Sequence, residues 1–201
     1  MNPSARLAFE ESALPHLDSL YRVARRLCGD PSEAEDLVQD ALVRAYRFWG
    51  GFEPGTNVRA WLFTILRNTF YSELRRRVRA RAHVSELSNL GEPHGYTGAA
   101  PQELPSPESA VESKASADRV HQALAEIPED YRLAVVLADM EGFSYKEIAE
   151  VVGCPIGTVM SRLYRGRRQL HERLKASSAS PPAPAAEAPV SLDAYRKRGH
   201  G

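Results

Sequence analysis

Residues 142–175 have the types and spacing needed to recognise DNA. Ser144 and Glu147 form a capping-box pattern, in which each side chain can bond a backbone N–H group at the start of the same helix. Gly153 can adopt the left-handed conformation that ends a helix at low cost. A second helix is expected to follow from Ile156 after a short turn. A short helix, a glycine-containing turn and a longer helix in this order predict a helix-turn-helix unit.

The second helix of this unit has an apolar stripe and a basic, hydroxyl-bearing remainder. Val159, Leu163 and Leu170 recur at the spacing of a helix face that packs on a core. An α-helix fits the major groove, where Arg, Ser and Thr side chains reach base edges and further arginines neutralise phosphates. The candidate DNA contacts are Thr158, Ser161, Arg162, Arg165, Arg167 and Arg168. The alternative that the pattern leaves open is an ordinary basic helical hairpin with a solvated face.

A second basic segment, residues 59–81, begins with aromatic residues and ends in arginines. Its seven arginines, Arg59, Arg67, Arg75, Arg76, Arg77, Arg79 and Arg81, stand against the single acid Glu73. Aromatic rings can stack on bases while arginines bind the backbone, which is how single-stranded nucleic acid is held. For aromatic residues such as Trp61 and Phe70, we favour the alternative in which they belong to a core and only the arginines contact phosphate.

The formal net charge of zero conceals an uneven distribution of charge. Residues 103–130 contain seven acids against Lys114 and Arg119, and they separate the two basic segments. A strongly basic segment repels itself unless a polyanion or an acidic partner compensates for it. The charge pattern therefore indicates a nucleic-acid-binding protein with two basic surfaces.

Catalytic and metal-binding patterns are missing from the sequence. It contains no HExxH motif, no glycine-rich phosphate loop after a strand and no nucleophile elbow. Cys28 and Cys154 lie far apart without the spacing of a zinc site or a disulfide framework. No signal peptide is recognised, and no apolar run approaches the roughly 20 residues of a membrane span. We expect a cytoplasmic protein that is not an enzyme, needs no cofactor and is not inserted in a membrane.

The candidate residues are expected to lie on helices. Apolar spacing predicts a first helix over about Phe9–Leu27, ended by Gly29. Asp30 is expected to cap a second helix that starts at Pro31, and Asn57 is expected to cap a third. The predicted fold is therefore all-α.

Composition divides the chain into two small helical domains joined by a flexible linker. Residues 1–84 form the first domain, and the Gly-, Pro- and Ser-containing residues 85–107 form the linker. Residues 108–176 form the second domain, in which a helix over about 129–140 precedes the helix-turn-helix unit. The Pro- and Ala-rich residues 177–201 are expected to be a disordered tail.

Three strings give the chain a resemblance to bacterial sigma factors of the sigma-70 family, extracytoplasmic-function (ECF) group. They are DPSEAEDLVQDALVRAY at 30–46, TNVRAWLFTILRN at 56–68 and FSYKEIAEVVGCPIGTVMSRLYRGRRQL at 143–170. The resemblance covers nearly the whole chain and implies two helical domains. These are sigma region 2, which binds core RNA polymerase and recognises and melts the −10 element, and sigma region 4, which recognises the −35 element.

The resemblance also implies roles for individual residues. Contacts with the clamp helices of the polymerase β′ subunit are expected from Asp36, Leu37, Gln39 and Asp40. The −10 element is expected to be recognised by Thr56, Asn57, Val58, Asn68, Arg75, Arg76 and Arg77. The −35 element is assigned to the same arginines and hydroxyls of the helix-turn-helix unit as above, and the β flap is expected as a further contact on core polymerase. Met160 stands where many ECF factors have Arg or Lys, and Val58 where some have an aromatic residue.

The resulting expectation is a promoter-specificity subunit of RNA polymerase, restrained by an anti-sigma factor. Two alternatives remain. A stand-alone helix-turn-helix regulator would bind a palindromic duplex as a dimer. A sigma-mimicking protein would bind an anti-sigma factor without recognising DNA, but it would have no need of the arginines at 75–77 and 162–168.

Overall fold

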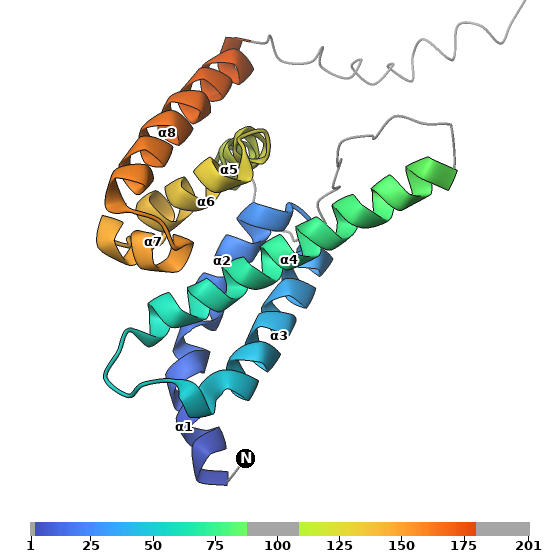
Figure 1. The fold of residues 1–201 in the computed structure, drawn as a ribbon. Coiled ribbons are helices and arrows are strands. Elements are labelled where there is room, and N and C mark those ends of the chain that lie inside the picture. The colour runs from blue at the N-terminus through green and yellow to red at the C-terminus, as the bar shows by residue number, and fades with distance from the viewer. Residues whose placement is uncertain (1–2, 88–108, 180–201) are drawn as a thin grey trace, which may run out of the picture.

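The computed structural model describes residues 3–87 and 109–179, and these residues form helices joined by turns and short loops (Figure 1). The first group comprises α1 (Pro3–Ala13), α2 (Leu17–Cys28), α3 (Pro31–Phe48) and α4 (Val58–Leu87). The second comprises α5 (Ser109–Ala125), α6 (Glu129–Val135), α7 (Tyr145–Val152) and α8 (Ile156–Ala179). Within the described ranges no strand occurs, so the all-α prediction is confirmed. Most of the predicted linker and tail lies outside these ranges.

The predicted first helix is interrupted near its middle. A short 3-10 turn, η1 (Leu14–His16), separates α1 from α2, and Pro15 lies within it. Proline has no backbone N–H group and its ring clashes with the preceding turn, so a helix cannot pass through it undisturbed. The prediction of one continuous helix over Phe9–Leu27 was therefore wrong, although both flanking segments are helical.

The predicted caps of the next two helices are confirmed. The Asp30 side chain accepts a hydrogen bond of 3.0 Å from the backbone N–H of Glu33 at the start of α3. Asn57 Oδ1 accepts one of 3.0 Å from the backbone N–H of Ala60 at the start of α4. These bonds satisfy N–H groups that have no partner within the helix, and they fix where α3 and α4 begin.

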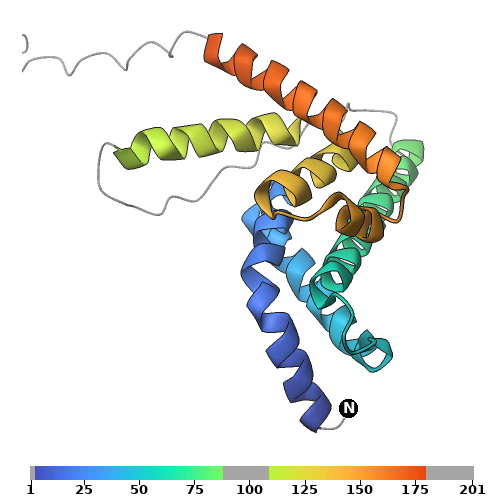
Figure 2. The same ribbon diagram turned by 90° about the vertical axis from the view of Figure 1, so that its left-hand side faces the viewer.

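The core of the first group lies between α2, α3 and α4. Val23 of α2, Leu37 of α3, and Phe63 and Leu66 of α4 are each at most 1% exposed. Figures 1 and 2 show α2, α3 and α4 (blue to green) side by side, and each pair is in contact. This packing holds α4 in place along its first five turns and leaves its later, arginine-rich turns more exposed.

The helix-turn-helix unit has the predicted structure. Ser144 and Glu147 form the capping box of α7, and Gly153 ends this helix at a φ of 64°, in the left-handed region. α8 follows from Ile156 and continues to Ala179, slightly beyond the predicted end of the domain at residue 176. The helix predicted over residues 129–140 is found as α6 followed by a π-helical turn, η3 (Val136–Met140).

The two groups of helices pack against each other. α7 lies against the first turns of α4, and α5 and α6 contact α2 (Figures 1 and 2). The apolar core is continuous across this contact, where the rings of Phe63 and Phe143 meet edge to face with centroids 5.0 Å apart. The helix-turn-helix unit is thus held beside the N-terminal end of α4.

Candidate nucleic-acid interface

The side of α8 that faces away from the core carries four of the predicted DNA contacts. They are the exposed residues Ser161, Arg165, Arg167 and Arg168, while Val159 and Leu163 on the opposite face are at most 1% exposed. The Arg165 guanidinium donates to the Tyr131 hydroxyl at 3.3 Å, and that of Arg168 pairs with Glu172 one turn later at 2.9 Å. Both arginine contacts are with exposed or half-buried partners, so polyanionic DNA can compete for these arginines.

Arg162 and Arg167 both pair with carboxylates of neighbouring elements, and Arg167 stays 46% exposed. Arg162 pairs with Asp130 at 2.7 Å and its side chain is only 21% exposed. Arg167 makes two bonds to Asp139, at 2.6 and 3.0 Å, and these hydrogen bonds raise the pKa of its guanidinium. Both side chains bridge α8 to the segment that begins at α6, so they also position the helix. Thr158 is half-buried at the first turn, where its carbonyl accepts from the Ser161 hydroxyl at 2.9 Å.

Two exposed apolar side chains lie among these arginines and were not among the predicted contacts. Met160 is 52% exposed and Tyr164 is 69% exposed, and they are four residues apart on the same face of α8. Together with Tyr145 they line a shallow recess of about 490 Å³ that also includes Arg167 and Arg168. The sequence did contain a signal for this pair. Met160 and Tyr164 lie four residues apart and outside the core stripe of Val159 and Leu163, so both could be expected at the surface.

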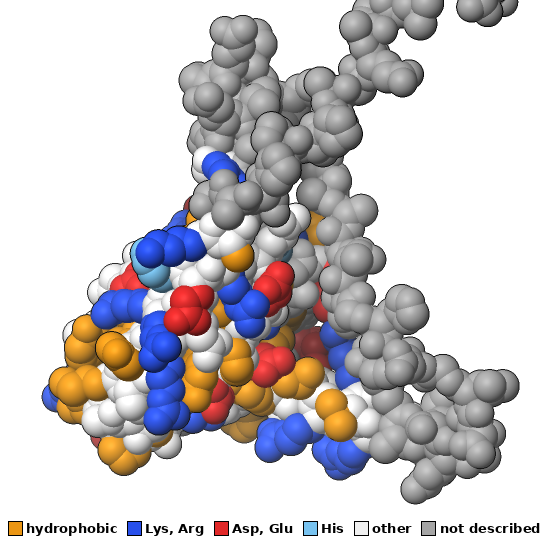
Figure 3. Space-filling model, turned by 90° about the horizontal axis from the view of Figure 1, so that it is seen from above, with side chains coloured by type: hydrophobic (Ala, Val, Ile, Leu, Met, Phe, Trp, Pro, Cys, Tyr) orange, Lys and Arg blue, Asp and Glu red, His pale blue; other side chains and the backbone are white. Residues whose placement is uncertain are grey.

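Figure 3 shows this association of basic and apolar side chains at the surface. On the left of that view, where Figure 1 places α7 and α8, Lys and Arg side chains lie next to hydrophobic ones. Arginines bind phosphates, and apolar groups fit the methyl group of thymine in the major groove. Arginines that can bind phosphates and apolar side chains that can contact thymine methyl groups therefore lie together on this surface.

The predicted −10 residues lie in three places along α4. Thr56 and Asn57 are exposed in the loop before the helix, and Val58 is half-buried against the core. Thr56 donates its hydroxyl hydrogen to the carbonyl of Glu53 at 2.7 Å. Asn57 both caps α4 and donates its side-chain amide to Glu147 Oε1 of α7 at 2.7 Å.

The remaining −10 residues lie farther along the same helix. Asn68 is exposed in the middle of α4, while Arg75, Arg76 and Arg77 follow about two turns later. Arg76 is 78% exposed, whereas Arg77 pairs with Glu33 at 2.9 Å and is 39% exposed. At about 1.5 Å per residue the loop and the arginines are roughly 25 Å apart, so they cannot contact the same nucleotide.

The aromatic residues of α4 belong mainly to the core, as favoured above. Phe63 is 1% exposed, and Trp61 packs against Trp49 and Phe52 with ring centroids 5.9 and 5.0 Å away. The Tyr71 hydroxyl donates to Asp130 at 2.6 Å. These rings pack within the protein in this structure and are not exposed for stacking on bases.

An acidic and polar surface lies on α3. Asp36, Gln39 and Asp40 are exposed on this helix. Leu37 is 0% exposed and packs in the core, because its position falls on the inner stripe with Ala34 and Ala41. Its side chain thus supports the helix from within, and its expected contact with polymerase stays a prediction.

Where the structure describes the chain, three general features bear on function. No group of three or more His, Cys, Asp or Glu side chains there could hold a metal ion. None of the helices described has the length and apolar character needed to cross a membrane. Burial raises the pKa of the Cys28 thiol to about 12.

The fold defines a helical protein with a helix-turn-helix unit, and comparison with known proteins gives its family. The sequence matches Sigma-70 region 2 over residues 14–80 and Sigma-70 region 4 over residues 117–170. It is 39% identical to the ECF RNA polymerase sigma factor SigE of Mycolicibacterium smegmatis over 85% of this chain, which spans 63% of that relative. It is 35% identical to the ECF sigma factor EcfG of Rhodopseudomonas palustris, covering 81% of this chain and 83% of EcfG.

A solved structure shares the arrangement of the helices. The sigma factor RpoE of Bartonella quintana, in complex with the anti-sigma factor NepR, is similar with a TM-score of 0.65 and 36% identity. The similarity covers 84% of this chain and 97% of that one. The chain belongs to the sigma-70 family of RNA polymerase sigma factors, in the ECF group. Because this family is not enzymatic, the expectation of a protein that is not an enzyme is confirmed.

Proposed function

We propose that this chain is the subunit that brings core RNA polymerase to promoters with matching −35 and −10 elements and helps to open them. The observation that carries the proposal is that one chain combines an exposed basic face on α8, a basic end of α4 and an acidic face on α3. A stand-alone regulator would need only the first of these. We assign residues 1–84 to core binding and the −10 element, and residues 108–176 to the −35 element.

Recognition of the −35 element is assigned to α8 in the major groove. Ser161 and Arg165 are placed for contacts with the duplex, and Arg168 for a phosphate. To these we add Tyr164 and Met160, whose exposed apolar atoms suit thymine methyl groups. Arg162 and Arg167 contribute mainly by holding α8 against Asp130 and Asp139, with DNA contact requiring them to exchange partners.

Recognition of the −10 element is assigned to the start and the far end of α4. Thr56 and Asn57 are exposed at the loop and carry the hydrogen-bonding groups needed to hold a base that has left the stack. Arg75 and Arg76 are exposed farther along and suit the backbone of the separated strand. Val58 and Asn68 lie between these two places and complete the proposed path.

Binding of core polymerase is assigned to the exposed surface of α3. Asp36, Gln39 and Asp40 present acidic and polar groups that would complement a basic pair of helices, the proposed partner being the clamp helices of the β′ subunit. We assign binding of the β flap of polymerase to region 4. The bond-forming chemistry would belong to polymerase, and the chain would act in the cytoplasm, where the chromosome is.

An anti-sigma factor is the proposed restraint on this activity. RpoE of Bartonella quintana, which shares 36% identity with this chain, was solved with the anti-sigma factor NepR bound. The similarity to a sigma factor in that bound state supports a partner of the same kind here.

Binding to core polymerase tests the proposal through α3. We expect the purified chain to bind core enzyme tightly, and the pair D36K and D40K to lose that binding because two carboxylates become like charges to the partner. The control is E11K, which reverses an exposed acid on α1 in the same domain. Equal binding by the double variant and the control would reject the α3 assignment, and no binding by the unmodified chain would reject the function.

A further inference from the structure

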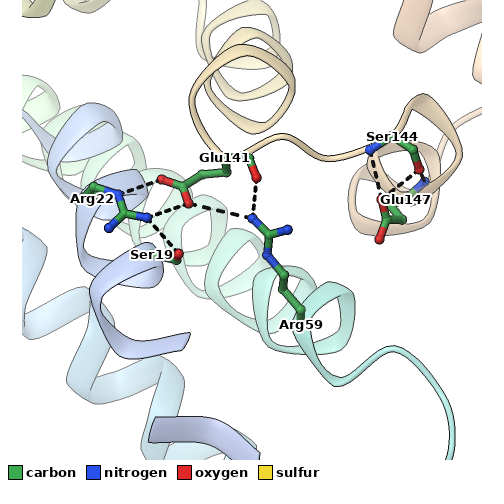
Figure 4. Close-up of polar contacts among 6 residues, drawn as sticks. All are labelled: Ser19, Arg22, Arg59, Glu141, Ser144 and Glu147. Atoms are coloured by element: carbon green, nitrogen blue, oxygen red, sulfur yellow. Dashed lines mark hydrogen bonds and ion pairs between the residues drawn. The ribbon is translucent and has the colours of Figure 1, made fainter. Parts of the chain in front are cut away.

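A single buried carboxylate joins the two groups of helices. The Glu141 side chain, in the turn before α7, is 2% exposed and accepts two hydrogen bonds from Arg22 of α2, at 3.0 and 2.9 Å (Figure 4). Arg59 of α4 lies 3.8 Å from the same carboxylate and donates to the Glu141 backbone carbonyl. The charge of Glu141 is thus neutralised by arginines of the other domain.

Further buried contacts surround this ion pair. The guanidinium of Arg59 lies 4.0 Å from the ring centroid of Phe143, which is 3% exposed and meets Phe63 edge to face. Arg132, which is 8% exposed, donates to the carbonyl of Leu27 at the end of α2 at 2.9 Å. Hydrogen-bonded polar groups around an apolar centre are typical of a specific interface.

The same interface uses residues assigned to promoter recognition. Asn57 of the −10 loop donates to Glu147 of α7 at 2.7 Å. Asp130 receives the hydroxyl of Tyr71 from α4 at 2.6 Å and pairs with Arg162 of α8. Asn57, a predicted −10 contact, is therefore bonded directly across the interface. Arg162, a predicted −35 contact, is linked to the interface through the carboxylate of Asp130.

This arrangement cannot bind both promoter elements at once. The numbering of the −35 and −10 elements places them about 25 base pairs apart, which is about 85 Å of duplex at roughly 3.4 Å per base pair. In the structure α7 contacts α4 directly. The domains must therefore separate before both elements can be bound.

We propose that the free chain is held in this closed form with Glu141 as the latch, and that release of Glu141 from Arg22 and Arg59 is a step in activation. The closed form itself stands on the contacts above, while its consequence for promoters rests on the proposed function. Opening breaks the bond from Asn57 to Glu147 and the bond from Tyr71 to Asp130, so one interface holds both a residue of the −10 loop and the carboxylate that positions Arg162.

The test measures the distance between the domains in the full-length chain by fluorescence energy transfer. Dyes are attached to V43C on α3 and H171C on α8, both at exposed positions, in a C28S and C154S background. We expect high transfer in the free protein. E141Q should shift the population toward low transfer by about fivefold, because it removes the buried charge that Arg22 and Arg59 neutralise across the interface.

Two further variants keep the test informative. R22Q removes the partner from the other domain and should give the same shift even if E141Q disturbs the turn before α7. E150Q, which neutralises an exposed acid on α7, is the matched control and should leave transfer unchanged. Circular dichroism verifies that every variant keeps its helices.

The outcomes separate the closed form from the sigma function. Low transfer in the unmodified free chain overturns the closed form, whatever the chain does in transcription. High transfer that survives both E141Q and R22Q overturns the role of Glu141 as the latch. High transfer that falls in both variants supports the proposal, even if polymerase binding fails and the proposed function with it.

Discussion

Gly166 of α8 lies directly against Val135 of α6, and a β-carbon at Gly166 would stand 2.7 Å from Val135 Cγ2 and 3.1 Å from the carbonyl oxygen of Tyr131. A neighbouring backbone atom cannot move aside as a flexible side chain can. We therefore expect G166A to force α8 away from α6 and to lower the free energy of unfolding by about 1–3 kcal/mol. Thermal or urea unfolding measures this loss.

Gly157 provides the control for that substitution. It is also in α8, but a β-carbon there would meet nothing within 4 Å. G157A should be neutral or stabilising by up to about 1 kcal/mol, because alanine favours a helix more than glycine does. Equal losses in both variants would show that the contact with α6 is not the cause.

Tyr164 should contribute to binding of the −35 duplex without contributing to stability. Its side chain is 69% exposed. Removing its apolar contact in Y164A is expected to cost about 1 kcal/mol, or roughly fivefold in Kd. Fluorescence anisotropy on the duplex measures the change, with V43A on α3 as an exposed apolar control. Unchanged affinity for Y164A would remove this residue from the proposed DNA surface.

Arg76 should bind the backbone of the separated strand. Its side chain is 78% exposed near the far end of α4. R76A is expected to weaken binding of single-stranded DNA similarly for different sequences and to reduce the salt slope by about 1, since one phosphate contact is lost. R44A, at an exposed position on α3, is the comparison. A salt slope that stays the same in R76A argues against a phosphate contact.

The capping box of α7 should make stability depend on pH. Hydrogen bonds from Ser144 hold the pKa of Glu147 below its ordinary value of 4.5, with a smaller effect from Asn57. Because the pKa is lowered on folding, this contribution is complete above pH 4.5 and is lost as pH falls through the lowered value.

S144A tests that dependence. At pH 7 we expect it to cost about 1 kcal/mol, as loss of an N-cap does. The difference from the unmodified chain should narrow below pH 4.5 in urea unfolding experiments. A difference that is constant down to pH 3 would mean that the charge of Glu147 is not involved.

Cys28 should be unreactive while the protein is folded. Burial, reinforced by the charge of Glu33, raises the pKa of its thiol to about 12, so almost no thiolate is present at neutral pH. In C154S, a thiol reagent at pH 8 should react slowly with the folded chain and rapidly after unfolding in urea. Fast reaction of the folded chain would reopen a redox role for Cys28.

The sequence predicted the local features well because their causes are local. Asp30, Asn57 and Ser144 each bond a backbone group three residues away, so the cap is visible in the spacing of the residues. The apolar stripe of α8 is visible for the same reason. Pro15 was a local signal too, but the apolar spacing on both sides of it outweighed its effect on the helix.

The contacts between distant segments could not be predicted in this way. Arg22 and Glu141 are 119 residues apart, and no pattern within either segment pairs them. Arg162 and Arg167 looked like free DNA contacts because Asp130 and Asp139, which bind them, lie on other elements. The need for glycine at position 166 is likewise visible only in the packed structure, where α6 leaves no room for a side chain.

Reconstituted transcription tests the central claim most directly. The purified chain is added to core RNA polymerase on a library of genomic fragments, and the 5′ ends of the transcripts are sequenced. The account predicts discrete new start sites that share one −35 and −10 pair and that disappear with the double variant D36K and D40K. Transcription that stays at the level of core enzyme alone, while the chain binds core enzyme or duplex DNA, would contradict it and would indicate a sigma mimic or a stand-alone regulator respectively.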